Sequence, residues 1–396
     1  MEIKPPFLGR ALLLCLWHGA ALADGFSVEN SGYLSARGLY NESRAADSSQ
    51  LSALGLFKSR LKWDDDTLAL QLRPAASYSD PSRHGTADVN TDALYWEHRF
   101  SPVSFIFAGR RKIVNGVALG RNPSDFFNLG KTQDNTLTDE DRRAEIRGDD
   151  MAGWSYFGPS YSIQSTLAAP ARGSRRARAM AQWNGNLSAL ASDVSLSAYY
   201  ADRPGLGLNL SSVIGDKITA YAEAAWRKGR DRQNPVLSAT GAVVAVADAE
   251  RRWIADWVAG GQYTTDSGVS LNAEYWRNGN GFSGAEQAGI ANALNTGQGN
   301  PPLAGSLLAT PGLRKNSVFF RIANLPLSET LKGEITGIHD LDDGSGLVRA
   351  AANWEVGKAD SLRAGFDRFS GARWSEYGAS GIRWRMFVVY KKYLMG

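Results

Sequence analysis

The 396-residue sequence predicts an all-β fold, namely a single transmembrane, antiparallel, up-and-down β-barrel of about 18 strands, with about 16 strands as the alternative. Three observations predict this fold. Apolar and polar side chains alternate with a period of two along most of the chain. The alternating segments run for about 9 to 12 residues, which a tilted strand needs to cross a bilayer. Aromatic residues collect at the ends of these segments, as they do at the membrane interfaces of barrels.

The composition excludes several other classes of protein. After the first 25 residues no apolar run reaches the length of about 18 residues that a spanning helix needs, so the chain is not a helical membrane protein. The single cysteine excludes a disulfide scaffold and a cysteine-rich metal site. Intrinsic disorder is excluded by the 12 Trp, 14 Tyr and 15 Phe residues.

The first residues have the pattern of a secretory signal. A positive start at Lys4 and Arg10 precedes the short apolar stretch 11–17, and a small-x-small cleavage site ends at Ala23. We therefore predict that residues 1–23 are a signal peptide and that the mature chain leaves the cytoplasm. The alternative is an N-terminal anchor helix, for which this apolar stretch is short.

The strand pattern recurs from one end of the mature chain to the other. In the segment 103–112, for example, Phe105 and Phe107 are expected on the lipid-facing side and Arg110 and Lys112 on the inner side. Weaker patterns cover residues 153–157, 175–183 and 184–192, and they leave the strand count open by two. The clear alternating segments are residues 52–63, 67–78, 91–101, 103–112, 193–200, 206–211, 218–227, 252–263, 269–275 and 382–391.

The polar face of these strands distinguishes a membrane barrel from a soluble β-sandwich, which would bury its apolar face in a core. Charged residues lie near the centres of the strands, at Arg60, Glu97, Glu223, Glu274 and Glu334. A sandwich that places an apolar face inward could not accommodate so many charges near its interior, whereas a water-filled lumen can. The pattern therefore favours the barrel.

Short and long connections alternate along the predicted barrel domain, residues 24–396. Short turns include residues 64–66 and 101–102, whereas the long links are 113–150, 229–250 and 278–313. Short periplasmic turns and longer outer loops are typical of outer-membrane barrels, and an even strand number returns both ends to the periplasm. Within the last long link, residues 284–294 are predicted either as a short helix or as an unstructured loop.

The inward-facing residues are predominantly basic. About two bases occur for each acid, and rings of Arg and Lys favour anions in a pore. The alternative role for any one of these residues is a cross-strand ion pair that stabilises the wall. The predicted pore-lining basic residues are Arg60, Arg73, Arg99, Arg110, Lys112, Arg178, Arg227, Arg321, Arg349, Arg363, Arg383 and Arg385.

The long polar link 113–150 is the third outer loop and is a candidate constriction. A loop of this length in a compact fold usually has a function. Folded into the lumen, its acids would face the basic wall, narrow the pore and set a transverse field. The alternative is an exposed extracellular loop. The predicted constriction residues are Asn122, Pro123, Asp125, Asp139, Glu140, Asp141 and Asp149.

Within this region Gly109-Arg110-Arg111-Lys112 is followed by Asn122-Pro123-Ser124-Asp125-Phe126-Phe127. The spacing resembles a Gly-Arg … Asn-Pro-x-Asp pattern of Gram-negative outer-membrane channels of the porin and alginate-export kind. Those channels often carry Trp-Gly where this chain has Asn115-Gly116, and they commonly finish on an aromatic residue, whereas this chain ends in Gly396. The resemblance implies a channel, either for nutrient uptake or for export of an acidic polysaccharide.

The sequence therefore predicts a channel in the outer membrane of a Gram-negative cell that passes small or polymeric acidic solutes passively and prefers anions. The expected partners are outer-membrane lipid and lipopolysaccharide, anionic small molecules or acidic polysaccharide, and other copies of the chain, with no nucleic acid. No cofactor, metal or catalytic residue is expected.

Two other functions stay open. The first is a lipid-modifying enzyme, for which His84, His98 and His339 are the candidate bases of the mature chain. The second is a plugged barrel that acts as a structural protein or an adhesin.

Overall fold

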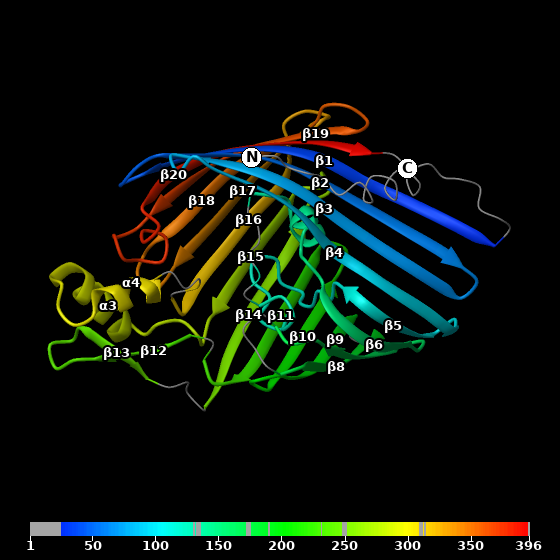
Figure 1. Cartoon of the computed structure of the whole chain (residues 1–396), viewed down its shortest axis with the longest axis horizontal. Helices are drawn as coiled ribbons and strands as arrows, with labels where there is room; N and C mark the ends of the chain where they lie inside the picture. The colour runs from blue at the N-terminus through cyan, green and yellow to red at the C-terminus, as the bar shows by residue number, and fades with distance from the viewer. Residues whose placement is uncertain are drawn as a thin grey trace.

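The computed structural model describes residues 25–129, 131, 136–171, 176–188, 191–230, 232–247, 252–308, 312 and 314–394, and these residues form a closed antiparallel β-barrel (Figure 1). The predicted signal peptide, residues 1–23, lies outside the described residues. The main sheet has 18 strands, which confirms the predicted fold class and the larger of the two strand counts.

The first half of the wall consists of β1 (Phe26–Ser43), β2 (Ser48–Trp63), β3 (Asp66–Asp80), β4 (His84–Ser101), β5 (Ser104–Arg111), β6 (Asp149–Phe157), β7 (Tyr161–Ala168), β8 (Arg178–Leu187) and β9 (Ser192–Tyr200). The second half consists of β10 (Gly205–Ile214), β11 (Ile218–Lys228), β14 (Trp253–Thr264), β15 (Ser270–Arg277), β16 (Asn316–Pro326), β17 (Leu331–Asp340), β18 (Gly346–Glu355), β19 (Asp360–Ser370) and β20 (Ile382–Leu394).

The barrel closes between its first and last strands. β1 pairs with β2 on one side and with β20 on the other, and both pairings are antiparallel. At this seam Ala36 lies between Ala53 and Tyr390. Closure gives every wall strand a hydrogen-bonded partner on both sides, so that no open sheet edge faces the membrane.

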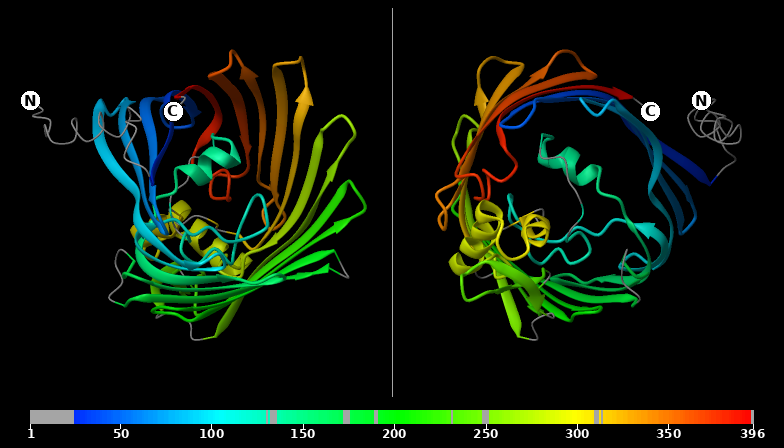
Figure 2. Two further views of the ribbon diagram at one scale, coloured as in Figure 1. Left: turned by 90° about the vertical axis from the view of Figure 1, so that its right-hand side faces the viewer. Right: turned by 60° about the vertical axis from the view of Figure 1, so that its left-hand side comes forward.

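One end of the barrel carries short turns and the other carries long loops; we call them the turn end and the loop end. At the loop end a two-stranded hairpin, β12 (Asn234–Leu237) and β13 (Val243–Ala247), packs against α3 (Gly284–Thr296) and α4 (Pro301–Leu308) (Figures 1 and 2). Val243, Phe282, Ile290 and Leu307 form the apolar core of this loop assembly.

Of the two alternatives for residues 284–294, a short helix or an unstructured loop, the structure has the helix, α3. Its start is determined by Ser283 and Glu286, which form a capping box, and its end by Gly297 in the left-handed conformation (φ 71°). No helix of the described part of the chain is long and apolar enough to cross a membrane.

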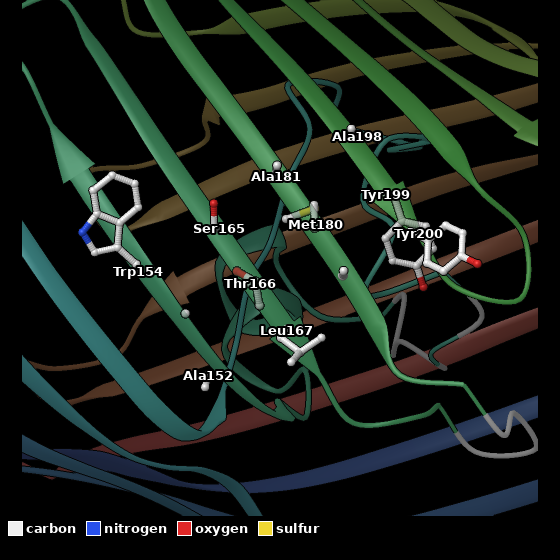
Figure 3. Close-up of a pocket in the computed structure, with 12 residues that line it drawn as sticks. Ala152, Trp154, Ser165, Thr166, Leu167, Met180, Ala181, Ala198, Tyr199 and Tyr200 are labelled. Atoms are coloured by element: carbon white, nitrogen blue, oxygen red, sulfur yellow. The ribbon is translucent and has the colours of Figure 1, made fainter.

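The outer face of the wall is apolar, because directly paired residues of neighbouring strands share a face. Leu196 of β9 lies opposite Leu208 of β10 and is 49% exposed. On β6 to β9 the outer face is hollowed into a groove of about 630 Å³, where Trp154, Leu167 and Tyr200 surround small alanine side chains (Figure 3). Exposed apolar surface of this extent suits a lipid environment.

One part of the predicted alternation is wrong. Phe107 is buried on the inner face, where it belongs to an apolar cluster, and Phe105 packs against the same cluster. Arg110, predicted to line the pore, instead lies on the outer face: it pairs in register with the exposed Leu94 and with Asp150. The reason is that the inner face here is not polar, because it supports the apolar part of an inner loop.

The outer face provides a test of the assignment of the two faces. Replacing Leu196 with arginine should lower the free energy of unfolding from lipid vesicles by about 2–4 kcal/mol, because the charge would enter hydrocarbon near the middle of β9. The matched variant Gln164→Arg, on the inner face near the middle of β7, should lose less than about 1 kcal/mol. Equal losses in the two variants would contradict the assignment of the faces.

Candidate functional site

Between β5 and β6 the described residues 112–129, 131 and 136–148 fold back inside the barrel, and we call them the inner loop (Figure 2). It carries one short helix, α2 (Asp139–Ala144). Its first part contacts β11 and β15, and its second part contacts β1, β16 and β20. The loop therefore reaches from one side of the lumen toward the other.

A buried carboxylate on the wall holds the first part of the inner loop. Glu223 of β11 is only 1% exposed and accepts hydrogen bonds from the backbone N–H groups of Val117 (3.0 Å), Ala118 (3.4 Å) and Ser124 (2.8 Å). The Ser124 hydroxyl donates to the same carboxylate at 2.9 Å. One side chain thus satisfies three backbone N–H groups of the loop.

A second wall carboxylate holds the adjacent residues in the same way. Glu274 of β15 accepts from the N–H groups of Leu119 (2.6 Å) and Gly120 (3.2 Å), and also from the Tyr221 hydroxyl (2.7 Å). The indole of Trp276 donates to Glu274 at 2.6 Å. A Cβ at Gly120 would lie 2.1 Å from the Trp276 ring, so only glycine allows this approach.

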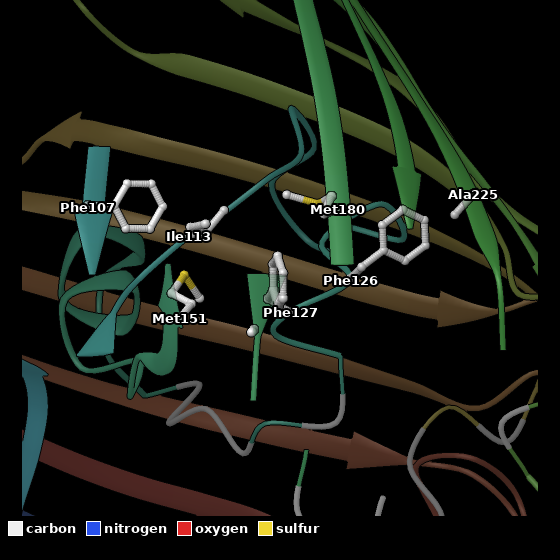
Figure 4. Close-up of a cluster of buried hydrophobic side chains, with 8 residues drawn as sticks. Phe107, Ile113, Phe126, Phe127, Met151, Met180 and Ala225 are labelled. Carbon is white, nitrogen blue, oxygen red and sulfur yellow. The ribbon is translucent and has the colours of Figure 1, made fainter. Parts of the chain in front are cut away.

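The next turn of the inner loop rests on apolar side chains (Figure 4). The rings of Phe126 and Tyr199 stack with centroids 5.0 Å apart, and Phe127 meets the same tyrosine edge-on at 5.9 Å. Met151 and Met180 complete the contact from β6 and β8. These wall residues face inward and provide the apolar surface on which the aromatic side chains of the loop are buried.

Ion pairs hold the second part of the inner loop. Asp139 at the start of α2 pairs with Arg321 of β16 at 2.5 Å, and Asp141 pairs with Lys391 of β20. Just after α2, Glu145 pairs with Arg37 and accepts from the Tyr33 hydroxyl at 2.7 Å.

The two parts of the inner loop are also joined to each other. Arg142 of α2 donates to the backbone oxygen of Leu119 at 3.2 Å and pairs with Asp139 at 3.0 Å. On the β3 side, the Gln71 amide donates to the carbonyl of Ala144 at 2.9 Å. The inner loop is therefore a braced element rather than a free segment.

The predicted constriction residues divide into three groups. Asn122, Pro123 and Asp125 belong to the first part of the inner loop, where Pro123 and Asp125 are buried and Asp125 accepts from the Asn115 N–H and the Asn128 amide. Asp139 and Asp141 are paired with wall bases, whereas Glu140 is exposed. Asp149 belongs to β6 rather than to the loop, and it pairs with Lys131 (2.8 Å) and Arg178 (2.9 Å).

Besides Arg110, which pairs with Asp150 at 2.7 Å on the outer face, eight of the predicted pore-lining bases are engaged with acids. They are Arg73 with Asp92, Arg178 with Asp149, Arg227 with Asp256, Arg321 with Asp139 and Glu334, Arg349 with Asp367, Arg363 with Glu334, Arg383 with Glu42, and Arg385 with Asp367. Lys112 donates to the carbonyl of Ala144. Arg60 and Arg99 are exposed on the inner face, opposite Glu29 and Phe105 respectively.

The alternating pattern places Glu223 and Glu274 on the inner face, as the structure does, but it does not indicate that they hold the loop. Their partners are backbone amides, which no residue type marks in a sequence. The contacts of Tyr33, Arg37 and Lys391 to the loop were not predicted for a related reason, because they join strands to a loop that lies more than 100 residues away in the sequence.

The three histidines of the described residues lie apart from the inner loop. His98 pairs with Asp66 at 3.0 Å and stacks on Trp96 at the turn end. His84 begins β4, and His339 lies one residue before the end of β17. Among the described residues, no three His, Cys, Asp or Glu side chains are grouped so that they could hold a metal ion.

No protein-family model and no curated protein matches the sequence. Among solved structures, the chain resembles OccK11 (OpdR) of Pseudomonas aeruginosa at 12% identity, over 95% of this chain and 99% of that chain, with a TM-score of 0.55. OccAB1 of Acinetobacter baumannii matches at 11% identity over 93% and 97% of the two chains (TM-score 0.56). OccD3 (OpdP) of P. aeruginosa matches at 13% identity over 95% and 94% (TM-score 0.53).

These neighbours are Gram-negative outer-membrane porins, and this chain has their fold. The expected resemblance to outer-membrane channels of the porin kind is therefore confirmed at the level of the fold.

The carboxylate contact to the inner loop can be tested by removing it. Glu223→Ala should speed hydrogen exchange of the Val117, Ala118 and Ser124 amides by about tenfold or more, because hydrogen bonds to a charged group contribute about 1.5–3 kcal/mol. Glu355→Ala, at an exposed acid at the end of β18, should leave these amides unchanged. Unchanged exchange in the Glu223 variant would contradict the anchoring role.

The inner loop should also respond to pH through Asp125. Burial raises the pKa of this carboxyl from 3.8 to about 6, against the hydrogen bonds donated by Asn128 and the Asn115 N–H. The folded state therefore holds this proton more tightly than the unfolded state does. Its contribution to stability is present below about pH 4 and is lost as the pH rises to about 6.

Asp125→Asn removes this titration while retaining an oxygen acceptor. The difference in unfolding free energy between the two proteins should change by up to about 3 kcal/mol between pH 4 and pH 6.5, with the wild type losing stability relative to the variant. Denaturant titrations at a series of pH values measure it. A difference that stays constant with pH would show that Asp125 does not titrate in this window.

Proposed function

We propose that this protein is a channel of the Gram-negative outer membrane that lets small solutes diffuse passively and prefers anions. The fold of the porins, the apolar outer face with aromatic ends and a braced loop inside the lumen support this proposal. In this setting the turn end faces the periplasm and the loop end faces outward. Export to this membrane requires cleavage of the signal peptide near Ala23.

The anion preference depends on the charge that remains after pairing on β1 to β5. Three inner-face acids of this sector are each held by a base: Glu29 by Lys62, Asp92 by Arg73 at 2.7 Å, and Glu97 by Arg111 at 3.2 Å, whereas Asp88 of β4 is exposed on the same face. Lys58, Arg60 and Arg99 are exposed on the same inner face. This remaining positive charge is the observation that carries the proposal.

The inner loop does not cancel this charge. Two acids of α2, Asp139 and Asp141, are paired with Arg321 and Lys391 on other strands, so those bases largely neutralise their negative charge. A loop lodged in the lumen also favours small anions over a polymeric acid, because it narrows the path. The expected partners besides the solute are outer-membrane lipid, lipopolysaccharide and other copies of the chain.

Planar-bilayer recordings test both the channel and its preference. In a KCl gradient the reversal potential should indicate that chloride is favoured over potassium. The double variant Arg60→Gln/Arg99→Gln should lower the permeability ratio roughly twofold or more, because it removes unpaired luminal charge. Arg110→Gln, which removes a base from the outer face, is the matched control and should leave the ratio unchanged.

Three outcomes would count against this proposal. A silent bilayer would contradict the channel itself. Cation preference would contradict the assigned selectivity, and an equal effect of the control would show that the charge of β2 and β4 does not face the ion path.

A further inference from the structure

The inner face of β7 to β10 carries a cluster of hydroxyl and amide groups. Four of them form a row at one level across four strands, since Ser162 pairs with Asn184, Asn184 with Ser195, and Ser195 with Asn209. The Ser124 hydroxyl of the inner loop lies 2.9 Å from the side-chain oxygen of Asn209, which places this row on the luminal side.

A cavity of about 380 Å³ lies against this row. Val117 of the inner loop contributes to its lining, as do Phe157 and the turn at residues 158–160. The cavity therefore lies between the inner loop and the turn end, and its volume falls in the range of small-molecule sites. The one charged side chain in its lining is Asp193, which accepts from the Asn186 amide at 2.8 Å.

The polar groups of the row are held in place by one another. The Asn184 amide donates to Ser162 at 3.0 Å, and the Gln182 amide donates to Asn184 and to Ser195, both at 2.9 Å. Hydroxyl and carboxamide groups have more donor and acceptor sites than these contacts use. The row thus presents both donors and acceptors in fixed positions, which lowers the entropy cost of binding.

An aromatic ring completes the cavity. Phe157 is 51% exposed and is stacked on Phe105 with ring centroids 5.8 Å apart. It presents an apolar face beside the polar row. A flat apolar face next to alternating donors and acceptors matches a sugar ring, which has C–H groups on its faces and hydroxyls around its edge.

We propose that this cavity is a binding site for a neutral, hydroxyl-rich solute of the saccharide type. The site rests on the proposed channel function, because the solute reaches it through the lumen. It extends that function, since a wall of amides and hydroxyls does not depend on charge for binding. The lumen then has two sectors, with bases on β2 to β4 for anions and this row on β7 to β10 for sugars.

Glucose is the probe, and the ion current in KCl is the measurement. Glucose added on the turn-end side should reduce the current through the wild-type channel in a concentration-dependent way. The double variant Asn184→Ala/Ser195→Ala should raise the half-blocking concentration about tenfold, because it removes two polar partners. Gln262→Ala on β14, another inner-face amide, is the control and should keep the wild-type value.

A normal KCl current in the double variant shows that its barrel has formed. If that variant does not conduct, Phe157→Ala provides the second test, and it should also weaken the block by glucose. If the wild-type channel conducts but glucose does not reduce its current, or if the variants are blocked as strongly as the wild type, the saccharide site is contradicted and the channel function is not. A wild type that is silent in KCl overturns the channel and the site together.

Discussion

The arrangement of the lumen depends on the hydrogen bonds between wall carboxylates and the backbone of the inner loop. A loop inside a barrel is away from bulk water at the points where it touches the wall, so its N–H groups need acceptors there. Glu223 and Glu274 accept from five such groups, between Val117 and Ser124. Because both acids project from central positions of rigid strands, they determine where the loop crosses.

This anchoring has a consequence for the charge of the lumen. Two acids that face inward on β11 and β15 accept hydrogen bonds from backbone amides, and two acids of α2 form ion pairs with wall bases. Charges used in this way contribute little to the field that a passing ion meets. The charge selectivity of the lumen therefore depends on the smaller set of exposed side chains. A count of all inward Arg and Lys residues overstates the positive charge that a passing ion meets.

Much of the fold could be predicted from the sequence, because the alternation of apolar and polar residues is the direct signature of a wall with two different sides. The prediction was wrong at Phe105, Phe107 and Arg110, because it assumed that every apolar residue faces lipid. The inner loop buries Phe126 and Phe127, so the wall beneath them is apolar on its inner side as well. Gly109, in a left-handed conformation (φ 119°), lies immediately before the misassigned Arg110.

The candidate site was harder to predict, since the inner loop is defined by long-range contacts rather than by local pattern. Its constriction residues could be named, but their partners lie on strands at both ends of the chain, from Tyr33 to Lys391. Arg142 then ties the second part of the loop to Leu119 in the first. Both parts of the inner loop are fixed to different strands and to each other, so the wall residues that hold the loop determine the width of the path. Most of the loop's own surface residues can then affect which solutes pass.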